Sequence, residues 1–171
     1  MSATTTPLNY RTATPEIIAA SWAKVAEKNA ASEVFYQDLR TEIQGEIATI
    51  IHNYRSADVQ NVVVNIAADA LSMRHRLSGE MSAMRSRVAK AYNGYKKILG
   101  DRREYYSTGY GLKVADTKLK ELLDRDLSEW QTQIKIAETH LEFLQECIKQ
   151  CDQVGFAIKN RVELLRYALN G

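Results

Sequence analysis

The chain has 171 residues, of which 26% are charged and 8% aromatic, with a formal net charge of +2. This length suffices for one domain with a buried core. Its two prolines, Pro7 and Pro15, lie near the N-terminus and glycine is sparse, which excludes turn-rich sandwiches and barrels and predicts an all-α fold. The chain starts without a basic or apolar stretch and has no membrane-length apolar segment. We therefore expect a cytoplasmic protein with no membrane partner.

The N-terminal residues predict a flexible segment followed by a capped helix. Residues 1–13 are rich in threonine, and we expect them to be flexible, with residues 14–171 forming a single helical domain. Thr14-Pro15-Glu16 supplies an N-cap, a proline at the first helical position and an acid in the first turn. A helix over residues 15–54 follows. The polar residues Asn29 and Ser32 interrupt its apolar pattern and suggest a break or a bend.

Apolar residues spaced by three and four predict two further helices, over residues 57–106 and 116–170, joined by a turn at 107–111. Within the last helix, Asp126 followed by Glu129 resembles a capping box. Narrow apolar seams of this length require partner helices. We therefore expect a long antiparallel helical hairpin with coiled-coil-like helices in an oligomeric assembly. A compact four-helix bundle would use the same pattern.

The positive charge is concentrated in the second helix. Residues 73–103 contain nine basic residues and only two acidic ones, Glu80 and Asp101. On a helical wheel the basic residues form two stripes that flank small, uncharged side chains, so a polyanion can approach the backbone. Coiled coils also place cations beside their seams and pair them with acids. The spacing alone leaves nucleic-acid contact and structural pairing equally open.

The aromatic residues at the end of the second helix favour nucleic acid over structural pairing. Tyr105 and Tyr106 follow Arg102 and Arg103 with only Glu104 between them, and aromatic rings stack on unpaired bases while arginines bind phosphates. The residues that we expect to bind nucleic acid are Arg85, Arg87, Lys90, Lys96, Lys97, Arg102, Arg103, Tyr105 and Tyr106.

No motif indicates catalysis. The chain has no glycine-rich loop followed by Lys-Ser or Lys-Thr, and its histidines lack the His-Glu-x-x-His spacing. His140, Cys147 and Cys151 share one helix face, but a metal site would need a fourth ligand that the sequence does not offer. We expect a protein that is not an enzyme and has no cofactor or metal.

Several segments of the chain resemble the UvsY recombination mediators of tailed phages. They are Arg102, Tyr105-Tyr106-Ser107 with Gly109, residues 124–127, residues 141–144, Ile148, and Phe156-Ala157-Ile158-Lys159-Asn160. The resemblance covers roughly residues 74–171, while the N-terminal third is unlike the family. The family's Lys-x-Arg-x-x-Tyr-Tyr element for DNA contact falls on residues 100–106, where Gly100 replaces the lysine and Asp101 and Glu104 dilute the charge.

The resemblance implies a single-stranded DNA-binding mediator that loads a RecA-like recombinase onto DNA covered by single-strand binding protein. It also implies a homo-oligomer, expected to be a ring, and a host-cell cytoplasmic location if the chain is phage-encoded. The alternative hypothesis is a helical head, neck or tail component, or a scaffold, with no nucleic-acid role.

Overall fold

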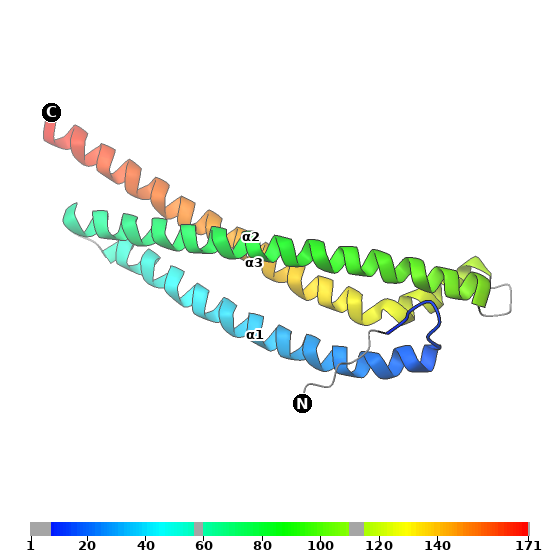
Figure 1. Ribbon diagram of the computed structural model, residues 1–171. Coiled ribbons are helices and arrows are strands. Elements are labelled where there is room, and N and C mark those ends of the chain that lie inside the picture. Colours follow the sequence, from blue (N-terminus) through cyan, green and yellow to red (C-terminus); the bar gives the residue numbers. More distant parts are fainter. Residues whose placement is uncertain (1–7, 57–59, 110–114, 171) are drawn as a thin grey trace. The chain divides into compact units, whose positions relative to one another are not determined.

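The computed structural model describes residues 8–56, 60–109 and 115–170, and within them it confirms the all-α class. Helix α1 spans Pro15–Ser56, α2 spans Gln60–Glu104 and α3 spans Asp116–Asn170 (Figure 1). A single π-helical turn, Tyr105–Gly109, continues from the end of α2. The predicted turn at 107–111 therefore begins inside this π-turn, and its last two residues lie outside the described ranges.

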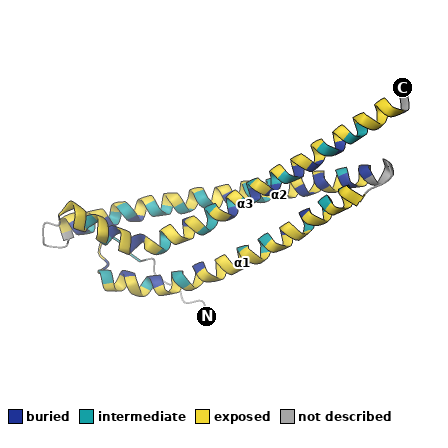
Figure 2. Ribbon diagram, turned by 180° about the vertical axis from the view of Figure 1, so that it is seen from behind, coloured by how far each residue is buried: buried dark blue, intermediate teal, exposed yellow. Residues whose placement is uncertain are grey.

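The chain divides into two compact units, and each helix contributes to both. Unit 1 is made from Met1–Glu33 and Arg87–Ala137, and unit 2 from Val34–Ser86 and Glu138–Gly171. Buried, intermediate and exposed positions alternate along the helices, as expected where one face of each packs on its neighbours (Figure 2). No helix in the described ranges is both long enough and apolar enough to cross a membrane.

The core of unit 1 holds the N-terminal segment against the helices. One buried cluster consists of Ile98, Tyr106, Leu123 and Leu127, and another of Ala13, Ile18 and Trp22. Tyr10 and Trp130 pack against both clusters. The Trp22 indole N–H donates to the Asp126 carbonyl oxygen at 2.7 Å. Tyr10 and Ala13, which lie in the predicted flexible segment, thus contribute to this core.

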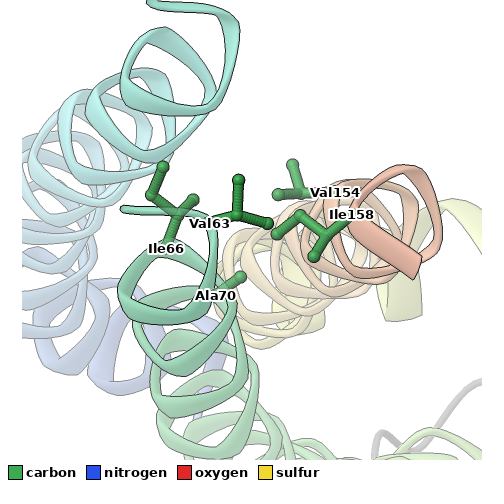
Figure 3. Packing of buried hydrophobic residues seen from close by; sticks show 5 residues of the cluster. All are labelled: Val63, Ile66, Ala70, Val154 and Ile158. Atoms are coloured by element: carbon green, nitrogen blue, oxygen red, sulfur yellow. The ribbon is translucent and has the colours of Figure 1, made fainter. Parts of the chain in front are cut away.

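The core of unit 2 joins α2 to α3. Val63, Ile66 and Ala70 on α2 meet Val154 and Ile158 on α3 (Figure 3). Apolar side chains of α1 pack against this cluster, and the Tyr54 hydroxyl donates to the Ala157 carbonyl oxygen at 3.2 Å.

Two local expectations from the sequence concern positions inside helices. Asn29 and Ser32 do not break α1, which continues through them; Asn29 is buried and its amide donates to both the carbonyl and the carboxylate of Glu129 at 3.0 Å. Asp126 does not start a helix either. It lies inside α3, and its carboxylate binds buried side chains in place of backbone N–H groups.

Candidate nucleic-acid interface

Five cationic side chains on the unit 1 part of α2 are exposed. We call this surface the basic face, and it consists of Arg87, Lys90, Lys96, Lys97 and Arg103. Lys90, Lys96, Lys97 and Arg103 form no ion pair with a carboxylate in the described ranges. Cations without protein partners are available to bind a polyanion.

Small side chains separate the cations of the basic face. Ala89, Asn93 and Gly100 are exposed, and a Cβ atom built on Gly100 would have no neighbour within 4 Å. Because nothing bulky stands between the cations, an extended phosphate backbone can approach the helix closely.

Two of the basic residues of α2 in unit 2, Arg74 and Arg76, have different surroundings. Arg74 pairs with Asp152, and Arg76 pairs with Glu46 at 2.7 Å and with Glu80 at 3.9 Å. These two arginines therefore form structural ion pairs, as expected for cations that flank the apolar seam of a coiled coil. Arg85 also belongs to unit 2, is exposed, and has no ion pair in the described part of the chain. Paired and unpaired cations thus occupy different stretches of one helix.

Arg102 is fully buried, and all five of its N–H donors have acceptors. Its Nε and Nη2 donate to Asp126 Oδ2 at 2.9 and 2.6 Å. Its Nη1 donates to the carbonyl oxygens of Tyr10 and Ala13 at 3.1 and 2.6 Å. The remaining Nη2 hydrogen meets the Tyr106 hydroxyl at 3.3 Å. The guanidinium therefore ties α2, α3 and the N-terminal segment together.

The two tyrosines after α2 complete this buried network. The Tyr106 hydroxyl donates to Asp126 Oδ2 at 2.7 Å, and burial, followed by this hydrogen bond, raises the pKa of Tyr106. Tyr105 is half-buried, with its ring centroid 4.2 Å from the Arg102 guanidinium carbon, which is cation–π distance.

The structure corrects the expectation that Arg102 and Tyr106 lie on the surface, because neither side chain reaches solvent. The physical reason is Asp126, a buried carboxylate that requires a counterion and hydrogen-bond donors. Asp126 is one of the acids that could pair with the basic residues under the structural alternative, and its partner in the structure is Arg102. Arg103 and Tyr105 keep exposed surface, so contact with nucleic acid stays a prediction for them.

The N-terminal segment also changes the charge of the basic face. Arg11 Nε lies 2.8 Å from the Asp101 carboxylate and 3.6 Å from that of Glu104. The sequence places these two acids in the basic stretch, where they would repel a phosphate chain. Arg11 offsets both of them, so residues outside α2 increase the positive potential of its surface.

His140, Cys147 and Cys151, which share one helix face, are packed among other side chains of the fold. Within the described ranges no group of three or more His, Cys, Asp and Glu side chains is arranged to hold a metal ion. The His140 ring stacks on Tyr36 with centroids 4.4 Å apart. Cys147 and Cys151 are buried, and burial raises the pKa of the Cys147 thiol to about 11.

The fold and this surface define an all-α protein that presents a row of cations on one long helix. A family model described as "Recombination, repair and ssDNA binding protein UvsY" matches residues 66–170. The chain belongs to the UvsY family, as the resemblance of its C-terminal part predicted. The match leaves out the first 65 residues, which include Arg11 and the N-terminal segment. No curated protein and no solved structure matches the chain.

Proposed function

We propose that this chain binds single-stranded DNA through the basic face of α2 in recombination and repair. The observation that carries the proposal is the exposure of Lys90, Lys96, Lys97 and Arg103 without ion-pair partners among the described residues. Membership of a family described as recombination, repair and ssDNA binding supports it independently. Phosphate contacts of this kind carry no sequence code, so binding is independent of sequence.

The role in recombination that we propose is that of a non-enzymatic mediator. The chain would hold single-stranded DNA so that a RecA-like recombinase replaces single-strand binding protein on it. It would act as a homo-oligomer, proposed to be a ring whose subunits contribute antiparallel helices. The mediator role, the ring and the antiparallel arrangement of helices rest on the family resemblance. A scaffold role without nucleic acid is the less supported alternative, because it leaves the unpaired cations without a ligand.

The binding proposal is tested by fluorescence anisotropy of a labelled single-stranded oligonucleotide at several salt concentrations. The double variant Lys90→Ala/Lys97→Ala is compared with Arg74→Ala, whose arginine is paired with Asp152 in unit 2. For single strands each lost phosphate contact lowers the slope of log K against log salt by about 0.7. We expect a shallower slope in the double variant only. An unchanged slope, or no binding by the parent chain at low salt, would refute the proposal.

The mediator role has a separate test. A RecA-like recombinase is added to single-stranded DNA covered with single-strand binding protein, and its filament assembly is followed with and without the chain. We expect faster assembly with the parent chain and a loss of this effect in Lys90→Ala/Lys97→Ala. If the chain binds DNA but does not change filament assembly, it is a DNA-binding protein and the proposed mediator role is wrong.

A further inference from the structure

The N-terminal segment and α2 form a pocket in unit 1 beside the basic face. Its volume is about 580 Å³, which lies within the range of small-ligand pockets. It is lined by Leu8, Asn9 and Tyr10 from the segment and by Gly94, Lys97 and Ile98 from α2. Arg11 and Asp101, which pair with each other, also line it. Only Lys97 belongs to the basic face as well.

The chemistry of this lining suits a planar heterocycle linked to a phosphate. Leu8, Ile98 and the Tyr10 ring supply apolar and aromatic surface. The Asn9 side-chain oxygen accepts the Arg11 backbone N–H at 3.1 Å, and its amide hydrogens have no acceptor in the described part of the chain. They can donate to a carbonyl or ring nitrogen of a base. Lys97 supplies a cation for the adjoining phosphate.

Tyr10 is held in place from two directions before any ligand binds. Its carbonyl oxygen accepts a hydrogen bond from Arg102, and its ring stacks on Trp22 with centroids 6.1 Å apart. A pre-positioned ring loses little conformational entropy when it takes up a ligand, so its contact contributes more fully to affinity.

We infer that this pocket receives one unpaired base of the strand whose phosphates lie on the basic face. The inference rests on the proposed function, and it adds a base-binding site that joins N-terminal residues outside the family match to residues of α2 inside it. A paired and stacked base cannot enter such a pocket without leaving its duplex. The pocket therefore favours single strands over duplexes, which the cations alone do not do.

The first test uses the unmodified chain and a single strand that contains 5-iododeoxyuridine. Irradiation cross-links this base to an aromatic residue in contact with it, and trypsin then releases residues 1–11, in which Tyr10 is the one aromatic residue. We expect cross-linked DNA on that peptide. Cross-links confined to the peptide that starts at Glu104 and carries Tyr105 would overturn the inference.

The second test separates the pocket from the phosphate contacts. Binding of an oligothymidylate and of an abasic strand of equal length is measured for the parent chain, for Tyr10→Leu, and for Tyr105→Leu, which removes the other ring expected to stack on bases, after circular dichroism has verified their folding. One stacked base changes affinity by about fivefold or more. We expect the preference for the thymidylate strand to fall by that factor in Tyr10→Leu, with affinity for the abasic strand unchanged.

Two outcomes would contradict the inference in distinguishable ways. An equal preference in Tyr10→Leu and the parent chain would overturn the pocket while leaving the proposed function intact. A parent chain that binds neither strand at low salt would overturn the proposed function and the pocket with it.

Discussion

Arg102 and Arg103 are neighbours in the sequence with opposite surroundings, and their substitution should have different effects. Arg102→Ala leaves the Asp126 carboxylate buried without its counterion, so we expect a loss of about 3–5 kcal/mol in the free energy of unfolding. Arg103→Ala, at an exposed position, should unfold like the parent chain while binding DNA more weakly. Urea unfolding followed by circular dichroism measures the difference. Equal stability of the two variants would show that the Arg102 network contributes little.

Gly94 and Gly100 form a second matched pair of residues on α2. A Cβ atom on Gly94 would lie 2.9 Å from two ring carbons of Trp130, whereas one on Gly100 would meet nothing within 4 Å. We expect Gly100→Ala to stabilise the fold by about 0.5–1 kcal/mol through helix propensity. Gly94→Ala should destabilise it, because overpacking typically costs about 1–3 kcal/mol. Thermal melting compares them, and a higher melting temperature for Gly94→Ala than for Gly100→Ala would contradict the packing.

The buried thiols of α3 predict a loss of stability at alkaline pH. Burial raises the pKa of Cys147 to about 11 from an ordinary value of 9.0, and the pKa of Cys151 is also raised by burial. The unfolded chain therefore loses these protons at lower pH than the folded chain does. The stabilisation is fully present below pH 9 and is lost as the pH rises from about 9 to 11. Urea unfolding across this range should show a weaker pH dependence in Cys147→Ala, and an identical dependence would argue against the thiol.

At the scale of elements, the N-terminal segment should affect DNA binding through the acids that it neutralises. Arg11→Ala frees the carboxylates of Asp101 and Glu104 beside the basic face, so we expect weaker binding of single-stranded DNA. Adding Asp101→Asn and Glu104→Gln to this variant should restore the affinity. Anisotropy titrations measure both changes. Failure of the added substitutions to restore binding would mean that Arg11 contacts the strand directly.

The elements themselves could be predicted from local patterns, whereas their side-chain partners could not. Proline near the start and apolar spacing by three and four suffice for an all-α fold, because helix formation depends on nearby residues. The exposed cations of the basic face follow from the same helical wheel. The burial of Arg102 does not, because it depends on Asp126, 24 positions away, and on the carbonyl groups of Tyr10 and Ala13. The spacing of apolar residues along a helix does not indicate contacts between residues so far apart in the sequence.

At the scale of the whole molecule, polar and apolar surfaces are distributed unevenly between the two units. The unpaired cations of the basic face lie in unit 1. Among the described residues, most of the exposed large apolar side chains lie in unit 2, and they are Val34, Phe35, Val64, Leu71, Phe156, Leu164, Leu165 and Tyr167. Exposed apolar side chains that adjoin one another are typical of protein contacts. We therefore expect unit 2 to serve self-association and unit 1 to serve DNA binding.

This division of roles predicts that assembly can be disrupted separately from the fold. Phe156 is 66% exposed and Tyr167 is 80% exposed, so Phe156→Glu/Tyr167→Glu should leave the core intact while opposing burial of these positions between subunits. Ile17 in unit 1 is 49% exposed, and Ile17→Glu is the matched control. Size-exclusion chromatography with light scattering should give a smaller particle for the double variant only. In the proposed oligomer one strand would contact several basic faces, so dissociation should also weaken DNA binding through lost avidity. A double variant that keeps the parent mass would place the subunit contact elsewhere.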